Sequence, residues 1–292
     1  MGIALRLAAT AAAAACVLPA AGLAAIPAAQ ASASAARPAG VVAAAGELVD
    51  VTAGSRMWSR EPDTELPIAS ITKVMTAMVV LSAGNLNRKI TVTEAAVRYA
   101  QQNSAGSAGL QAGDVLTASQ LLEGLLLASG ADAAYLLARS YGPGWRAFVR
   151  KMNVTARRLG MTRTHFANYD GLPWPTEYTT YSTSRELIIM GEAAMKNAVF
   201  RHIVSQRSDR VAATRQHHRY FWKSTNLLLS RYQGAIGIKT GFTLAAGYCL
   251  LFEAKRHGKT LMGVVLDSTN SATTVRFTAA AKLLNWGFAH AN

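Results

Sequence analysis

The spacing of apolar residues changes character twice along this chain, and that order restricts the fold more than any other feature. Residues 47–51 and 56–59 alternate like two strands around a turn at 52–54. Most of 115–204 follows a helical period, and strand-like runs return at 235–240, 247–254 and 260–267. An amphipathic helix over 271–288 ends the pattern. This order predicts one sheet built from both ends of the chain, covered by the last helix, with a helical second lobe.

Residues 1–35 have the composition of a secretory signal peptide. Arg6 precedes an apolar, alanine-rich stretch without acidic residues, and 29–31 and 33–35 both fit a small-x-small cleavage site. The alternative is an uncleaved membrane anchor, but Pro19, Pro27 and the scarcity of leucine argue against a membrane span. We therefore expect an exported protein.

Cysteine content and charge indicate in which compartment the protein works and which partners it meets. Beyond residue 35 only Cys249 remains, in the apolar run 248–252, which is typical of a buried hydrophobic residue rather than a nucleophile. An exported chain without an internal disulfide fits a Gram-positive cell exterior. The net charge is +14, but the basic residues are spread through helical segments and a loop-like stretch at 207–219, without a nucleic-acid-binding motif. Anionic cell-wall polymers are therefore the expected counter-charge, and nucleic acid is not an expected partner.

The first reactive motif is Ser70-Ile71-Thr72-Lys73, at the start of a helix expected to be apolar around most of its circumference and so buried. Residues three apart share a helix face, which lets the Lys73 amine reach the Ser70 hydroxyl. Backbone N–H groups at a helix start are free to stabilise a developing oxyanion. Burial and a second cation would lower the pKa of Lys73 enough for it to act as a base. Alone, the motif equally describes an N-cap serine followed by a surface lysine.

Two further segments offer complementary groups. Lys239-Thr240-Gly241 lies in an expected strand, which directs Lys239 and Gly241 to one face and Thr240 to the other. Lys239 supplies the second cation, and Gly241 would allow a substrate backbone to approach closely. Ser129 lies at a break between helices, where its hydroxyl could relay a proton. Taken alone, Lys239-Thr240-Gly241 also fits an edge-strand lysine before a turn, and Ser129 also fits a helix cap.

Taken together, these segments resemble those of the penicillin-binding D-alanyl-D-alanine carboxypeptidases, low-molecular-mass serine peptidases of cell-wall synthesis. The matching segments are 67–77, 168–172 (Asn-Tyr-Asp-Gly-Leu), 237–241 and 245–249. The resemblance extends over essentially the whole chain after residue 35. It implies a two-lobed α/β (α+β) fold like that of β-lactamases and DD-peptidases, in which an antiparallel sheet flanked by helices adjoins an all-α lobe. We expect the catalytic domain over 36–292, with the sheet lobe at about 40–85 and 205–292 and the helical lobe at about 86–204.

The resemblance also implies a reaction and a role for each residue. Serine is acylated by a peptidoglycan stem peptide ending in D-Ala-D-Ala, the last D-alanine leaves, and water or an amine releases the acyl group. Ser70 would be the nucleophile, Lys73 the base, Ser129 the proton relay and Lys239 an electrostatic partner. Substrate binding falls to the strand: Thr240 would hold the terminal carboxylate, and the N–H groups of Ser70 and of Phe242, the residue after Gly241, would form the oxyanion hole. β-Lactam antibiotics are the implied inhibitors, and no cofactor is implied.

One position departs from the family pattern. The middle motif usually reads Ser-x-Asn, and here Ala131 takes the place of the asparagine. Loss of that amide removes about 1–3 kcal/mol of hydrogen bonding, so we expect slow or specialised turnover. Asp132 and Asp170 are expected to be structural, as cap and turn.

Two other functions stay open. A catalytically weak relative could use the same fold and basic surface only to bind wall polymers. A serine β-lactamase shares both lysine motifs but needs a carboxylate to activate water, and the 160s region offers Asp170 rather than a glutamate-containing loop. His217-His218 lacks the ligand spacing of a metal site. We expect a monomer without a stable membrane anchor, secreted or loosely bound to the wall.

Overall fold

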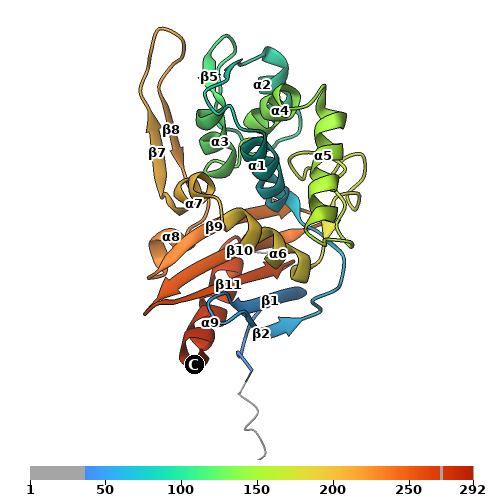
Figure 1. Cartoon of the computed structure of the whole chain (residues 1–292), viewed down its shortest axis with the longest axis vertical. Coiled ribbons are helices and arrows are strands. Elements are labelled where there is room, and N and C mark those ends of the chain that lie inside the picture. The colour runs from blue at the N-terminus through green and yellow to red at the C-terminus, as the bar shows by residue number, and fades with distance from the viewer. Residues whose placement is uncertain (1–36, 270–271, 292) are drawn as a thin grey trace, which may run out of the picture. The chain divides into compact units, whose positions relative to one another are not determined.

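The antiparallel sheet predicted from the two ends of the chain is present. The structure is a computed structural model that describes residues 37–269 and 272–291. Five strands lie in the order β2-β1-β11-β10-β9, each antiparallel to its neighbours (Figure 1). Their bounds are β1 (Ala45–Asp50), β2 (Ser55–Arg60), β9 (Ala235–Thr243), β10 (Gly247–Arg256) and β11 (Lys259–Leu266). Because β1 pairs with β11, the N-terminal and C-terminal strands meet inside one sheet.

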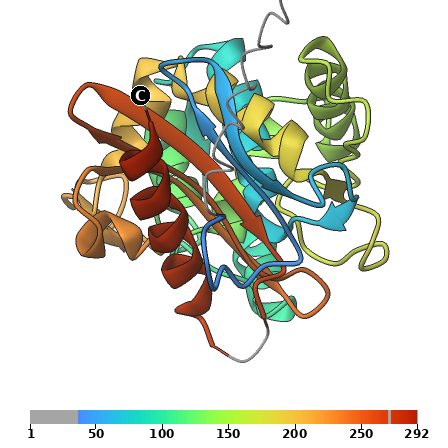
Figure 2. The same cartoon turned by 90° about the horizontal axis from the view of Figure 1, so that it is seen from below.

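Both faces of the sheet are buried. In β10, Leu250 and Phe252 belong to a cluster with α9 (Val275–His290), while Cys249 and Leu251 belong to the cluster on the opposite face. Figure 2 shows α9 lying across its face of the sheet. Each large apolar side chain removed from water in this way contributes about 1.5–3 kcal/mol, so the sheet forms the centre of the fold.

Helices cover the other face and form the second lobe (Figure 1). The central helix α1 (Thr72–Ala83) is buried through most of its length, and α6 (Ser184–Met195) packs against β1 and β11. The remaining helices are α2 (Glu94–Gln102), α3 (Ala118–Leu126), α4 (Ala131–Ser140), α5 (Trp145–Arg158), α7 (Ala198–Ser205) and the short α8 (Leu228–Arg231). The fold class expected from the sequence is confirmed. At the start of α6, the side chain of Thr183 caps the helix by accepting from the N–H of Glu186.

The stretch at 207–219 was expected to be loop-like; this is confirmed for 212–219 and wrong for 208–211, which form a strand. Residues 208–223 form a hairpin of β7 (Ser208–Val211) and β8 (Tyr220–Lys223), beside the helical lobe. The indole Nε1 of Trp222 donates to the carbonyl of Ala108 at 2.7 Å and ties the hairpin to that lobe. Basic residues on the exposed face disguise the strand alternation. Two shorter strand pairs join β3 (Leu66–Pro67) to β6 (Tyr181–Ser182) and β4 (Lys89–Thr91) to β5 (Val115–Thr117).

The described residues belong to one compact unit. The expected signal peptide lies outside them, and the boundary between the two lobes stays a prediction. Over 37–269 and 272–291, none of the helices combines the length and the apolar character that crossing a bilayer requires.

Candidate active site

Ser70 and Lys73 meet at the junction of a 3₁₀ turn and the central helix. The turn η1 (Ala69–Ile71) leads directly into α1, so the two side chains lie on one face. Lys73 Nζ donates to Ser70 Oγ at 2.9 Å and to the carbonyl of Asp170 at 3.2 Å. Lys73 is 1% exposed. The serine hydroxyl therefore has a buried amine at hydrogen-bonding distance, which is the arrangement a serine nucleophile needs.

A close backbone contact holds this junction in place. Ala69, just before Ser70, has φ +45°, a left-handed conformation that is rare for a residue with a side chain. Gly171 also has a positive φ, +80°, and a Cβ added there would lie 1.9 Å from the carbonyl oxygen of Ala69. The Asp170–Gly171 segment thus supports the backbone that presents Ser70.

Gly171→Ala is expected to destabilise the protein by roughly 3 kcal/mol or more, because the new methyl group would overlap the Ala69 backbone. Gly160→Ala is the matched control: Gly160 has φ +82° and nothing within 4 Å of an added Cβ. Gly160→Ala should lower the free energy of unfolding by about 1 kcal/mol, which is the cost of a side chain at a positive φ. Urea unfolding of both variants measures the difference, and equal losses would contradict the close contact.

The strand that carries Lys239 runs alongside Ser70. A Cβ added to Gly241 would lie 2.8 Å from the carbonyl of Ile68 and 3.3 Å from the Ser70 nitrogen. The missing side chain at Gly241 therefore lets β9 approach η1. The sequence-based reason, room for a substrate backbone, is not the contact seen here. Lys239 is fully buried, and its Nζ donates to the carbonyl of Thr240 at 3.0 Å.

Burial of the lysine beside Ser70 favours a neutral amine. Burial lowers the pKa of Lys73, and the carboxylates of Asp170 and Asp132 act in the opposite direction. Burial also lowers the pKa of Lys239 well below its ordinary value, and the charges of Lys73 and Arg276 add to this effect. The repulsion therefore acts on Lys239, whereas burial makes the Lys73 amine beside Ser70 a better proton acceptor than an exposed lysine.

These groups surround a cleft of about 500 Å³. Its lining includes six of the residues predicted from the sequence: Ser70, Lys73, Ser129, Thr240, Gly241 and Phe242. Ser129 lies between α3 and α4 with φ +59°, and its hydroxyl makes no hydrogen bond to any other described residue. Phe242 is 41% exposed and stacks on Tyr248, with 4.2 Å between ring centroids. The seventh predicted residue, Lys239, is buried beneath Thr240.

The departure from the family pattern lies at the edge of this cleft. Ala131 is the first residue of α4, fully buried, and its N–H donates to the carbonyl of Gly106 at 2.7 Å. The next residue, Asp132, was expected to cap a helix. Its carboxylate accepts from the N–H of Ala133 in the first turn of α4, at 2.9 Å, and also from the N–H groups of Ala108 and Leu110, at 2.9 and 3.3 Å. Asp132 therefore anchors the loop that lines one side of the cleft.

Asp170 is more than the turn residue expected from the sequence. Its Oδ1 accepts from the N–H of Leu172 at 3.2 Å, as a turn residue would, and its Oδ2 accepts from the hydroxyl of Tyr99 at 2.8 Å. The Tyr99 hydroxyl in turn accepts from Trp174 Nε1 at 2.8 Å. Sequence reasoning missed Tyr99, because a tyrosine on the polar helix α2 carries no sign that it reaches a carboxylate seventy-one residues away.

Sequence reasoning also missed Arg276, at the start of α9. Its side chain lines the cleft and is only 8% exposed, and Nη1 donates to the carbonyl of Gly241 at 2.8 Å. Its Nε is buried without a hydrogen-bond partner among the described residues. The guanidinium lies 5.0 Å from the ring centroid of Tyr248. A buried cation with an unused donor beside a cleft is suited to an anionic group of a ligand.

Comparison with known proteins identifies the chain. Residues 31–270 match the family model for D-alanyl-D-alanine carboxypeptidase, peptidase family S11. The chain belongs to this family. The D-alanyl-D-alanine carboxypeptidase of Streptomyces sp. (strain K15) is 41% identical over 261 residues, which cover 85% of this chain and 88% of that protein. Carboxypeptidase DacB2 of Mycobacterium tuberculosis is 35% identical over 243 residues, 83% of this chain and 81% of that one.

Solved structures of the family share the fold. The crystal structure of the Streptomyces K15 DD-transpeptidase superposes with a TM-score of 0.80 at 41% identity, covering 85% of this chain and 98% of that chain. Family membership separates this chain from the serine β-lactamase considered above.

Two other groups are placed away from the chemistry. Cys249 is fully buried, and burial raises the pKa of its thiol to about 12, so it stays protonated. His217 and His218 lie between β7 and β8, where His218 Nδ1 contacts Asp114 Oδ1 at 2.9 Å. In the described part of the chain, no group of three or more histidine, cysteine, aspartate or glutamate side chains is arranged to hold a metal ion.

Proposed function

We propose that this protein is a serine D-alanyl-D-alanine carboxypeptidase or transpeptidase that acts on peptidoglycan stem peptides through an acyl-enzyme. The observation that carries the proposal is the 2.9 Å hydrogen bond between Lys73 Nζ and Ser70 Oγ at the floor of the cleft. Membership of the carboxypeptidase family supports the substrate class.

Each step uses a named group. Ser70 Oγ attacks the carbonyl carbon of the penultimate D-alanine while neutral Lys73 takes the hydroxyl proton. The N–H groups of Ser70 and Phe242 stabilise the oxyanion. Ser129 gives its proton to the leaving nitrogen and takes the proton held by Lys73, the carbon–nitrogen bond breaks, and D-alanine departs. Water or an amine then attacks the ester and restores Ser70. Lys239, buried in the adjacent strand, is the electrostatic partner of Lys73.

Labelling with a β-lactam tests the proposal directly. Benzylpenicillin should add once to the purified protein, and the adduct should map by peptide mass spectrometry to the peptide that contains Ser70. A protein that stays unmodified, or is modified elsewhere, would leave the basic surface as the functional feature and favour the wall-polymer-binding alternative. Slow or specialised turnover because of Ala131 stays a prediction, and an ordinary carboxypeptidase rate would contradict it.

The terminal carboxylate of the substrate is assigned to Thr240 and Arg276. Arg276→Gln should reduce the preference for a D-Ala-D-Ala peptide acid over its C-terminal amide by roughly 10- to 100-fold, because one charge-assisted hydrogen bond is lost. The ratio of kcat/KM for the two peptides measures this. Arg157→Gln, on the exposed side of α5, should leave the ratio unchanged. An equal fall for acid and amide would contradict the assignment.

The acidic limb of the pH–rate profile should report the proton on Lys73. Because the pKa of Lys73 is lowered from its ordinary value of 10.5, the amine becomes neutral at a lower pH than an exposed lysine does. The acylation rate should therefore rise with pH and level off below pH 10.5. The Asp170 carboxylate opposes this lowering, so Asp170→Asn should move the limb further toward low pH. Stopped-flow acylation across pH measures both profiles. If the acidic limb stays at the same pH in Asp170→Asn, the Asp170 carboxylate does not influence the pKa of Lys73.

Export is the remaining part of the proposal. Residues 1–35 act as a signal peptide, and the mature protein works outside the membrane, associated with the cell wall. The supporting observation is the alanine-rich apolar stretch followed by two small-x-small sites. Intact-mass analysis of protein from the culture fluid should give a chain that begins close to residue 36, and a full-length chain retained in the membrane would contradict it.

A further inference from the structure

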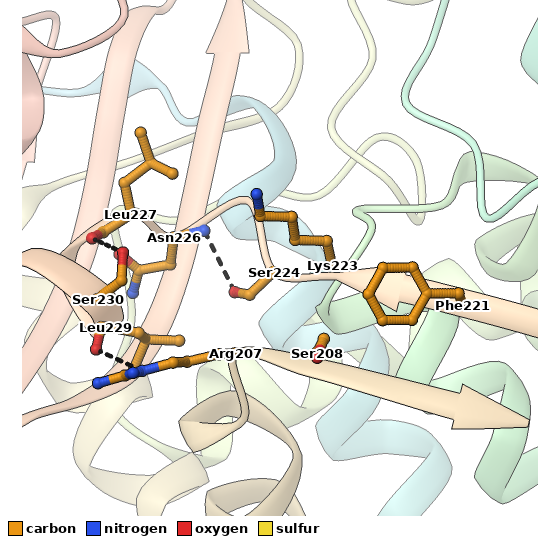
Figure 3. Close-up of a pocket in the computed structure, with 9 residues that line it drawn as sticks. All are labelled: Arg207, Ser208, Phe221, Lys223, Ser224, Asn226, Leu227, Leu229 and Ser230. Carbon is orange, nitrogen blue, oxygen red and sulfur yellow. Dashed lines mark hydrogen bonds between the residues drawn. The ribbon is translucent and has the colours of Figure 1, made fainter.

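A second cavity, of about 350 Å³, lies at the base of the β7–β8 hairpin (Figure 3). We call it the hairpin pocket. Its polar lining consists of Arg207, Ser208, Lys223, Ser224, Asn226 and Ser230. Each of these side chains carries a donor group, of which the Ser230 hydroxyl already donates to the carbonyl of Leu227 at 3.1 Å, and no carboxylate lines the pocket. Such a lining is suited to an anion.

The two cations of the pocket are available to a ligand. Arg207 Nε donates to the carbonyl of Leu229 at 3.2 Å, and the other guanidinium nitrogens make no hydrogen bond to any residue that the structure describes. Both Arg207 and Lys223 are exposed, and neither forms an ion pair with another residue of 37–269 or 272–291. Their positive charges are therefore not neutralised within the described part of the protein.

The register of the hairpin extends this charge beyond the pocket. Ser208 pairs with Lys223, and Arg210 pairs with Phe221, so these four side chains share one face. Phe221 is 56% exposed, with the Arg210 guanidinium 5.3 Å from its ring centroid. The intervening Asp209 points to the opposite face.

That opposite face packs on the helical lobe. Asp209 pairs with Trp222, which is 2% exposed, and its carboxyl interacts with Glu123 of α3. The carboxylate nearest to the basic face is therefore directed away from it, and the exposed face stays positive along the strand.

A buried amide in the pocket wall gives an independent indication of a ligand. Asn226 Oδ1 accepts from the N–H of Leu228 at 3.1 Å, which fixes the orientation of its side chain. Nδ2 is left buried, without a hydrogen-bond partner in the described residues, although Asn226 is only 4% exposed. Buried donors are rarely left unpaired in proteins, and an anion against this wall would supply the acceptor. The preceding Thr225 lines the catalytic cleft, so one loop separates the two sites.

We propose that the hairpin pocket binds a phosphate group of a phosphodiester polyanion. Hydroxyl, amide, ammonium and guanidinium donors reach the pocket from β7, β8 and the α8 segment, which suits a tetrahedral anion with several acceptor oxygens. Beyond the pocket, Arg210 and Arg219 line a neighbouring hollow on the same hairpin. There they can contact the next phosphates of the bound polymer. This continuation favours a polymer over free phosphate.

Binding is tested by calorimetric titration of the full protein with inorganic phosphate, poly(glycerol phosphate) and poly-glutamate of equal charge. The phosphodiester polymer should bind more tightly than either other probe. Arg207→Gln combined with Lys223→Gln should weaken polymer binding at least about 10-fold, since two phosphate contacts are lost. Arg157→Gln combined with Arg158→Gln removes the same charge from exposed positions on α5 and should weaken it less than about two-fold.

Three results would overturn the proposal. The two double variants could lose the same affinity for the polymer, poly-glutamate could bind as tightly as the phosphodiester polymer, or the unmodified protein could fail to bind the polymer. Tighter binding of free phosphate than of the polymer would overturn the polymer assignment. Benzylpenicillin labelling of both double variants, which leave Ser70 and its neighbours intact, verifies that they are folded. It also separates a failure of this proposal from a failure of the proposed catalytic function.

Discussion

Ser70→Ala is expected to abolish the covalent adduct with benzylpenicillin completely. The change removes the one hydroxyl that contacts the Lys73 amine, at 2.9 Å, and leaves the carbon framework of η1 intact. Without a nucleophile no acyl-enzyme forms, because the remaining groups only bind or polarise the carbonyl. Intact-protein mass spectrometry after long incubation measures the result.

Ser129→Ala is the matched control for this experiment. It removes another hydroxyl from the same cleft but leaves the nucleophile, so the adduct should still form, more slowly. Cys249 offers no replacement nucleophile, since it is fully buried and its thiol has a pKa raised to about 12. An adduct that persists in Ser70→Ala would therefore require a different site of attack and would refute the assignment of Ser70.

Lys73→Met is expected to slow acylation by benzylpenicillin on the order of 10³-fold, because general-base assistance is lost. Methionine keeps an unbranched apolar stem of similar length inside α1, where Lys73 is 1% exposed. Single-turnover acylation kinetics measure the rate. Stability should not fall with activity, since an apolar residue replaces a buried amine.

Lys151→Met provides the comparison. Lys151, on α5, donates to the carbonyl of Tyr141 at 2.6 Å and does not line the cleft. Its loss should leave acylation unchanged, and thermal unfolding of both variants separates chemistry from stability. If Lys73→Met acylated at the normal rate, the base would have to be another group, with Lys239 the nearest candidate.

The sequence was sufficient for the parts of the fold and site that are local in the chain. The hydrogen bond between Ser70 and Lys73 follows from three-residue spacing on a helix, and the strand at 247–256 follows from the apolar run 248–252. The order of the elements was enough to predict one sheet from both chain ends, since β1 and β11 each carry a strand pattern.

Contacts between distant segments were not predictable in the same way. Arg276 reaches the cleft only because α9 packs on β10 and β11 with its first turn next to Gly241 of β9, and Tyr99 reaches Asp170 only because α2 packs near the 168–174 segment. Neither side chain differs, in sequence, from an ordinary residue on a helix. At 208–223, frequent arginines disguised a two-residue alternation, because one face of the hairpin is basic and the other is buried.

The position of β1 between β2 and β11 has a consequence for how the protein is made. Synthesis proceeds from the N-terminus, so β1 emerges long before its partner strand β11, which ends at Leu266. Until then β1 and β2 can form only an isolated hairpin, which is marginally stable in water. Neither the sheet nor the wall of the cleft that contains Arg276 can be completed before β11 and α9 have been made, and pairing across such a separation is slow. This order of synthesis is compatible with the proposed export, because a chain whose sheet is incomplete can pass through a membrane pore in extended form.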